Sequence, residues 1–401
     1  LANDESGYRD FCRSFAAHFT ETNEASIAEH VCKACLIVPG ALDLDQLPHE
    51  VFAKALDEQT LHTGLVPWHW GSRALVAYRA GDPDSAIAYV QKSQESNSDE
   101  LMQMINSSIL ALAYHHLGQP GMSYRNWKDA RRQIDRFVNA ETGFPKGHDA
   151  LIAGILAQEA RSLLLDSQSS IADTRADWLQ TVATDPEISA AERFQILNDF
   201  GDWSAASKVG WQIVEQSPGN TEAWLKLAPV LVLGGNEEAY RDFCSRMVKQ
   251  FEGTDDVQIA ERTCKACLLI PNSIELSQLP IATLASSLDQ DGTSGPAEWF
   301  WLARALAAYR NNDAESAVHY VQESEQLSPG EITHALNLSI RALALAEIGK
   351  PEESRREAAI ASKIVKCRSE RDYNLGNHHD LLMTKILLRE VQASDYGARS
   401  P

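Results

Sequence analysis

The sequence contains no apolar run of the roughly 18–20 residues that a membrane-spanning helix needs. Basic residues are scarce as well, because 36 Lys and Arg stand against 56 Asp and Glu and give a net charge of −20. Nucleic acids and anionic lipid surfaces attract clustered Lys and Arg, so this charge balance disfavours both. We therefore expect neither a nucleic-acid partner nor a membrane partner.

Cysteine is too sparse for a disulfide framework, with seven residues in 401. Such usage is typical of a reducing compartment, so we expect a cytoplasmic protein. Catalytic signatures are missing too: the sequence has no Gly-x-Ser-x-Gly, no phosphate-binding loop and no His-Glu-x-x-His. No nucleophile, base and orienting group come together, so we expect this chain to be no enzyme and to need no cofactor.

What the sequence does contain is a second copy of itself. Residues 8–12 (YRDFC) recur as 240–244, and residues 32–36 (CKACL) recur as 264–268, an offset of 232 positions. The offset falls to 231 further on, where Trp68 matches Trp299 and Tyr78 matches Tyr309. Self-similarity of this length predicts a repeat architecture, and such proteins usually bind partners.

Within each copy, apolar residues recur every three or four positions and no segment alternates as a half-buried strand would. The pattern of helix, short turn and helix resembles the tetratricopeptide repeat, a helical hairpin of roughly 34 residues. That family has an aromatic residue at position 4, small residues at 8 and 20, and Pro at 32. Trp301, Ala305, Ala317 and Pro329 fit this pattern. The resemblance implies an all-α superhelix, or solenoid, of stacked hairpins in two homologous halves.

The repeats suggest three segments. Residues 1–165 form the first unit, 166–220 form connecting helices, and 221–401 form the second unit. The seven residues before Tyr8 are too few to supply the helix that precedes Tyr240, so the chain reads as starting inside a repeat of a longer protein. We expect Phe11, Phe15 and Phe19 to lack their native covering and to be covered by a crystal neighbour, a dimer contact or non-native packing.

Two pairs of chemically reactive residues occur in both copies. Cys32 with Cys35, and Cys264 with Cys267, present two sulfurs on one helix face, with Cys12 and Cys244 as further candidates. Zinc binding and redox chemistry stay open, but buried, reduced packing thiols without metal are the favoured interpretation. His148-Asp149 and His379-Asp380 invite a base or metal site, yet adjacent helical residues diverge, so helix capping and packing are favoured.

In tetratricopeptide arrays the first helix of each hairpin lines the concave side, and the resemblance assigns inward-facing positions here. Aromatic residues and Arg at such positions are typical of binding hot spots. For Trp68 and Trp299 the alternative is inter-repeat core. The candidate partner-binding residues are Trp68, Tyr78, Arg79, His115, His116, Trp299, Tyr309 and Arg310.

A narrower resemblance carries a functional expectation. Residues 260–271 (AERTCKACLLIP), 306–310 and 379–382 are similar to the C-terminal repeat arrays of some bacterial, eukaryotic-like serine/threonine protein kinases. The resemblance implies a non-catalytic arm that recruits a protein or peptide. The alternative is a small-molecule sensor that binds its ligand between the two halves.

Overall fold

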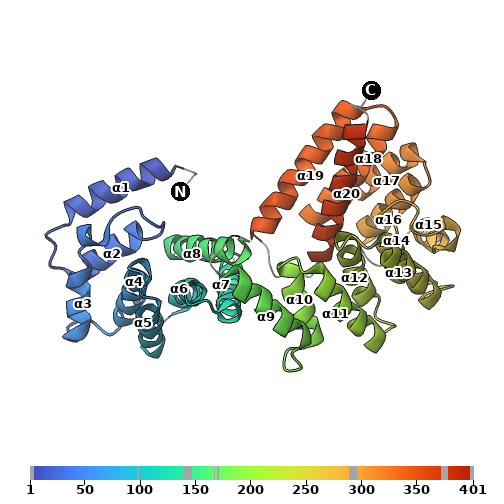
Figure 1. The fold of residues 1–401 in the computed structure, drawn as a ribbon. Helices are drawn as coiled ribbons and strands as arrows, with labels where there is room; N and C mark the ends of the chain where they lie inside the picture. Colours follow the sequence, from blue (N-terminus) through green and yellow to red (C-terminus); the bar gives the residue numbers. More distant parts are fainter. Residues whose placement is uncertain are drawn as a thin grey trace. The chain divides into compact units, whose positions relative to one another are not determined.

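The computed structural model describes residues 4–96, 99–139, 147–166, 168, 171–288, 296–371 and 378–397. Within these residues the chain is all-α, and two short 3-10 turns accompany the helices (Figure 1). The all-α fold of paired helices predicted from the sequence is confirmed. No helix in these ranges combines the length and apolar character that crossing a bilayer requires.

The chain divides into two units, Leu1–Trp178 and Leu179–Pro401. The division falls inside the segment 166–220, which the sequence predicts to be connecting helices. Helices α10 and α11 from this segment pack with each other, and α11 packs on α12 in unit 2.

Unit 1 is built from helices that pack mainly on their neighbours in sequence. These are α1 (Glu5–His18), α2 (Ala25–Cys35), α3 (His49–Asp57), α4 (Val66–Arg79), α5 (Pro83–Glu95), α6 (Glu100–His116), α7 (Pro120–Asn139) and α8 (Gly147–Leu165), with α9 (Ala172–Thr184) crossing the division.

Unit 2 repeats this order after three additional helices. The additional helices are α10 (Ala190–Asp199), α11 (Trp203–Gln216) and α12 (Thr221–Leu233). The helices that follow are α13 (Glu237–Gln250), α14 (Val257–Cys267), α15 (Ile281–Leu288), α16 (Ala297–Arg310), α17 (Ala314–Gln326), α18 (Glu331–Glu347), α19 (Pro351–Arg371) and α20 (His378–Gly397).

Small residues let the two helices of a hairpin approach closely. Ala305 of α16 and Ala317 of α17 are fully buried, as are Ala74 and Ala86 at the equivalent positions of α4 and α5. The second helices of these two hairpins, α5 and α17, are capped by Asp82 and Asp313; Asp313 accepts a hydrogen bond from the backbone N–H of Ser316 at 3.1 Å. The tetratricopeptide-type positions therefore do in the structure what the sequence pattern predicts.

In each unit, alternate helices along the chain pack on one another and form a continuous inner layer. In unit 1, α2 packs on α4, α4 on α6, and α6 on α8. In unit 2, α14, α16, α18 and α20 repeat these contacts, and α12 packs against both α14 and α20 (Figure 1). Unit 2 thus has an inner helix, α12, that extends the layer at the place where α14 and α20 meet.

Candidate functional site

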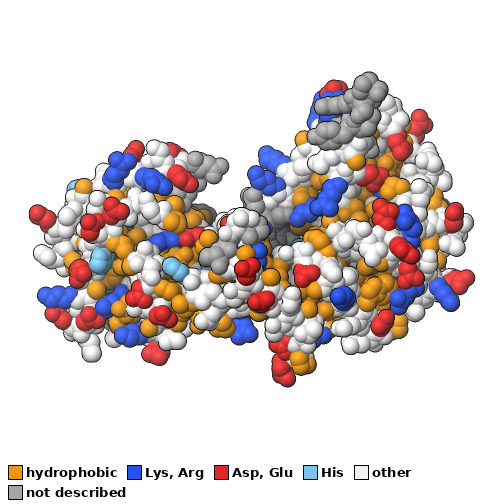
Figure 2. Space-filling view, in the orientation of Figure 1, with side chains coloured by type: hydrophobic (Ala, Val, Ile, Leu, Met, Phe, Trp, Pro, Cys, Tyr) orange, Lys and Arg blue, Asp and Glu red, His pale blue; other side chains and the backbone are white. Residues whose placement is uncertain are grey.

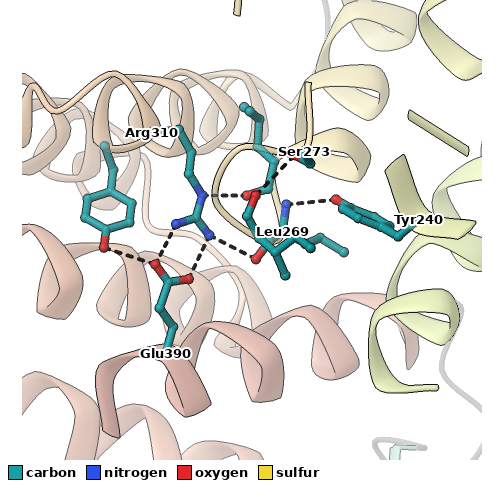
Figure 3. Close-up of polar contacts among 8 residues, drawn as sticks. Tyr240, Leu269, Ser273, Arg310 and Glu390 are labelled. Atoms are coloured by element: carbon teal, nitrogen blue, oxygen red, sulfur yellow. Dashed lines mark hydrogen bonds and ion pairs between the residues drawn. The ribbon is translucent and has the colours of Figure 1, made fainter. Parts of the chain in front are cut away.

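Arg310 of α16 lies at the centre of a buried polar network in unit 2 (Figure 3). Its Nε and Nη2 donate hydrogen bonds of 2.9 Å to the carbonyl oxygens of Leu268 and Leu269, which follow α14. Its Nη1 and Nη2 lie 2.6 and 2.8 Å from the two carboxylate oxygens of Glu390 on α20. This planar, bidentate geometry is the strongest form of an ion pair, and it fastens three elements together.

Unit 1 contains the same network around Arg79. The guanidinium donates to the carbonyl oxygens of Leu36 and Ile37 at 2.9 and 3.0 Å, and it pairs with Glu159 of α8 at 2.6 and 2.7 Å. Burial, with Glu159 beside the ring, raises the pKa of the Tyr78 phenol to about 12. The partners are 80 residues apart in the sequence, so nothing local indicates them.

The structure therefore places most of the predicted groove residues against the chain's own helices. Arg79 and Arg310 are held by α8 and α20, and Tyr309 is buried and donates to Glu390 at 3.1 Å. His115 is buried, and burial lowers its pKa. The exposed member is His116, which lies edge-on to Tyr78 at 6.4 Å between ring centroids.

Trp68 and Trp299 are partly buried and each carries a lysine above its ring. The Nζ of Lys33 lies 4.8 Å from the Trp68 centroid, and that of Lys265 lies 4.1 Å from the Trp299 centroid. A desolvated ammonium over an indole is a favourable cation–π contact. The two tryptophans thus border a second buried charge cluster in each unit.

That cluster joins the helix bearing the cysteines to the helix bearing the His-Asp pair. In unit 2, Lys265 Nζ lies 2.8 Å from Glu261 Oε1 and 3.1 Å from Asp380 Oδ1. Burial opposes the charge on Lys265, but Asp380 and Glu261 outweigh it and raise the lysine pKa. The equivalent aspartate in unit 1, Asp149, lies 3.2 Å from Lys33. The aspartates expected to cap helices are therefore members of buried ion pairs.

His379, beside Asp380, is the most strongly perturbed histidine that borders this cluster. Its side chain is only 8 % exposed, and burial lowers its pKa to about 4 although Asp380 acts in the opposite direction. In unit 1 the equivalent His148 is 70 % exposed. The same dipeptide thus lies in two different environments.

We expect acidification to destabilise unit 2 through His379. Between about pH 6.5 and 4 the unfolded chain binds a proton that the folded chain does not, so the free energy of unfolding falls as pH falls, by up to about 3 kcal/mol. Urea denaturation of wild type and His379→Gln at pH 7 and pH 5 measures this. If His379→Gln loses as much stability between pH 7 and pH 5 as wild type, the prediction is wrong. The pKa of His378 is also lowered to about 4, so the stability of the variant should still fall with pH, but less steeply than that of wild type.

The paired cysteines of both units, together with Cys12 and Cys244, are buried and free. All six lie at full burial, and the Sγ of Cys35 lies 3.8 Å from the carbonyl oxygen of Cys12. Burial raises the pKa of Cys35 to about 12 and raises those of Cys32, Cys264 and Cys267 further. Within the described residues no group of three or more His, Cys, Asp and Glu is placed to hold a metal. Neutral, enclosed thiols of this kind are poor nucleophiles.

These thiols should resist modification in the folded protein. We expect Cys367, which is partly exposed, to react first with iodoacetamide, and the other six to react only after denaturation. Mass spectrometry of the labelled chain, without and with urea, gives the count. Labelling of Cys32 or Cys264 at the rate of Cys367 in the native protein would contradict the expectation.

The structure shows a second surface that the repeat pattern did not indicate, since that pattern accounts for Trp301 only as the aromatic residue of position 4. Trp70 of α4 stacks on Tyr89 of α5 at 5.5 Å between centroids, and the guanidinium of Arg73 lies 4.7 Å from the Tyr89 ring. These three residues are partly exposed, and Lys92, which is exposed, lies 4.3 Å over Trp70. We call this group the outer cluster of unit 1.

Unit 2 has a matching outer cluster of Trp301, Tyr320 and Arg304. The two rings stack at 5.6 Å, and the guanidinium lies 4.4 Å from the Tyr320 ring. The signal was present in the sequence, because all three residues recur at the offset of 231. It was missed because a single hairpin pattern accounts for the Trp and leaves the Tyr and Arg without a role.

Unit 2 also contains a cavity of about 410 Å³ between α10, α11, α12 and α20. Polar side chains from three of these helices reach it. They include Gln195, Asn198, Glu222, Lys226 and His379.

No protein-family model matches the chain, and no curated protein matches it. Among solved structures, a chain in the structure of Naa15/Naa10 bound to HypK-THB is similar over 90 % of this chain, at 14 % identity and a TM-score of 0.23. This chain spans 64 % of the length of that chain. A match of this identity and TM-score says nothing about what the present chain binds.

Proposed function

We propose that this chain is a non-catalytic helical-repeat scaffold that binds a protein or peptide. The observation that carries the proposal is the outer cluster, which appears in both units with the same three residue types and the same stacking. Trp, Tyr and Arg are the residues most enriched in binding hot spots. Here they are pre-ordered on rigid helices, so little side-chain entropy is lost when a partner binds.

The buried networks support the same proposal in a different way. Arg79, Arg310 and the two lysine clusters fix the inner helices, so the surfaces beside them are rigid. Of the predicted groove residues, we propose His116, Trp68 and Trp299 as partner contacts, since these keep exposed or partly exposed surface and, unlike Arg79 and Arg310, are not held in a bidentate ion pair with Glu159 or Glu390. Tyr78, Arg79, His115, Tyr309 and Arg310 would then hold the helices in place.

We further propose that the two units arose by internal duplication. The support is the set of paired contacts, of which the Arg–Glu network is the clearest example. A buried serine network is another: Asn106 donates to Ser93 at 2.9 Å, and Asn337 donates to Ser324 at 2.8 Å.

Affinity purification from the cells that express the protein tests the binding function. We expect a partner in fixed ratio to the wild-type chain, and at least about 10-fold less of it with Trp70→Ala/Trp301→Ala. Ile360→Ala, at an exposed position of α19 away from the outer clusters, is the matched control. Equal recovery with the double variant and the control would contradict the assignment of the surface.

The finer proposal is that the scaffold is the recruitment arm of a bacterial serine/threonine protein kinase in the cytoplasm. It is supported only by the sequence similarity of residues 260–271, 306–310 and 379–382. Sequencing the gene upstream of Leu1 tests it directly. A Gly-rich loop, a strand lysine and a His-Arg-Asp loop are expected there, and further hairpins in their place would contradict it.

Small-molecule sensing is the second candidate, and the cavity in unit 2 favours it. Its volume lies in the range of small-ligand sites, and its wall mixes apolar side chains with amides and charges. Thermal-shift screening tests this candidate. A ligand that raises the Tm of wild type but not of Asn198→Leu would support it, and no stabilising ligand, or one that stabilises both proteins equally, would count against it.

A further inference from the structure

Helices α1 and α13 have the same place in their units. The Tyr8 hydroxyl donates to the carbonyl oxygen of Ala34 at 2.7 Å, and the Tyr240 hydroxyl donates to that of Ala266 at 2.7 Å. The face of α13 that points away from α14 should therefore correspond to the same face of α1. Sequence positions on the two helices can be compared one by one.

In unit 2 this face is covered. Phe243 of α13 is 0 % exposed, because Trp224 of α12 and Trp211 of α11 pack on it at 5.5 and 5.9 Å between centroids. In unit 1 the equivalent Phe11 is 51 % exposed. The same aromatic side chain is thus core in one unit and surface in the other.

The helix that closes each unit shows the same contrast. Leu382 of α20 is 3 % exposed and lies in the wall formed with Ala223 and Lys226 of α12, whereas the equivalent Leu151 of α8 is 62 % exposed. Phe11 and Leu151 are the two most exposed large hydrophobic residues among those the structure describes. In Figure 2 hydrophobic side chains reach the surface in the region between α1 and α8.

A third difference lies on the helix between them. Arg262 of α14 donates to Thr221 of α12 at 2.8 Å, and the equivalent residue on α2, His30, is exposed. All three differences fall at contacts of one element, since α12 packs on α13, α14 and α20. We call the corresponding surface of unit 1, formed by Phe11, Phe15, His30, His148 and Leu151, the open face.

We propose that the open face binds one amphipathic helix of a partner protein, placed as α12 is placed in unit 2. The helix would present a Trp or similar aromatic residue to α1, as α12 presents Trp224 to Phe243, and a leucine one position further on, at the place of Leu225, which lines a pocket with residues of α14 and α20. This inference rests on the proposed protein-binding function and names the class of partner for unit 1.

Charge also specifies the partner helix. In α12, Glu222 lies two positions before the Trp and lines a pocket with Arg262 of α14 and His379 of α20. The hydrogen bond from Lys226 is the main cause that lowers the pKa of Glu222, and the charge of Arg262 acts in the same direction. The equivalent residues on the open face are His30 and His148. An acidic residue two positions before the aromatic one is therefore expected in the partner.

A second copy of this chain is the weaker occupant. Trp224 and Leu227 of α12 are buried in their own unit, at 2 and 0 % exposure, so a second copy would have to release α12 before it could supply it. Exposing that face would cost the burial energy of a Trp and several aliphatic side chains.

A peptide with the sequence of residues 219–236, labelled with fluorescein, is the probe, and fluorescence anisotropy with the whole chain is the readout. We expect saturable binding to wild type, about 30-fold weaker binding or more to Phe11→Asp and to Leu151→Asp, and unchanged binding to Ile360→Asp. The two test positions are exposed, so the variants should fold. A peptide with Ala in place of Trp224 should bind as weakly.

Hydrogen exchange of the complex locates the peptide. Protection of α1, α2 and α8 is expected, whereas protection limited to α13, α14 and α20 would mean exchange with α12 and would overturn the proposal. Sedimentation velocity tests for a second copy as the occupant. If wild type is a dimer and Phe11→Asp is a monomer, the open face binds a second copy and the proposal of a partner helix is overturned. If the peptide does not bind but Trp70→Ala/Trp301→Ala still reduces recovery of the partner, this inference is refuted and the proposed protein-binding function stands.

Discussion

Replacing Arg310 by Met should lower the free energy of unfolding of unit 2 by about 3–5 kcal/mol, the usual cost of breaking a buried ion pair from one side. The side chain is 5 % exposed, and its loss leaves the carboxylate of Glu390 without its bidentate partner. The carbonyl oxygens of Leu268 and Leu269 lose their donors at the same time. Met keeps most of the aliphatic stem, so the loss reports on the charge network.

Urea denaturation followed by circular dichroism measures the effect as a shift of the midpoint at constant slope. Arg241→Met is the matched control, since Arg241 is exposed in an i,i+4 pair with Glu237 and should cost less than about 1 kcal/mol. The double variant Arg310→Met/Glu390→Leu should recover part of the loss, because no unpaired charge is then buried. An Arg310→Met protein as stable as Arg241→Met would show that the network contributes nothing.

Replacing Lys265 by Met should have an effect of similar size, about 3–5 kcal/mol, and a distinctive pH dependence. Without the ammonium, Glu261 and Asp380 are two buried carboxylates beside each other. Burial already raises the pKa of Glu261, and only Lys265 and Arg262 oppose the rise. In the variant at least one carboxyl group should take up a proton well above its usual pKa.

The sign of the pH effect follows from that proton. A carboxyl group with a raised pKa binds more protons in the folded than in the unfolded state, so the variant's deficit relative to wild type should shrink as pH falls from 7 to 5. Lys350→Met, which removes an exposed partner of Glu353, serves as the control at each pH. A deficit that stays constant or grows on acidification would contradict a buried carboxylate pair.

The fold could be predicted from the sequence because the residue patterns that specify it are local and repeated. The periodicity of apolar residues predicts helices, and the small residues Ala305 and Ala317 predict the close approach that the structure confirms. The helix Ala297–Arg310 carries Trp301 and Ala305, which the repeat pattern assigns to a first helix, and the turn after it ends at the capping Asp313. The turn between the two helices of the hairpin also recurs: its backbone is left-handed at Gly81 in unit 1, with φ 79°, and at Asn312 in unit 2, with φ 58°.

The candidate site could be predicted from the sequence only in part. The sequence singled out Arg79 and Arg310 as functional residues, but their carboxylate partners lie 80 residues away on helices whose packing no local pattern specifies. The outer clusters of Trp, Tyr and Arg recur at a fixed offset and were within reach of the sequence. They needed the structure to show that the three residue types stack on one another.

The sequence by itself determined the helices, their pairing into hairpins and the residues that the two units share, since these depend on neighbours a few positions apart. The tertiary structure decided which of the shared residues are buried. The sequence already indicated that Phe11 lacks the cover that Phe243 has, whereas only the structure shows that Leu151 is exposed and Leu382, at the matching place, is buried. In both pairs the exposure differs because burial depends on whether a helix placed as α12 packs against the residue, and α12 lies far from α20 in the sequence.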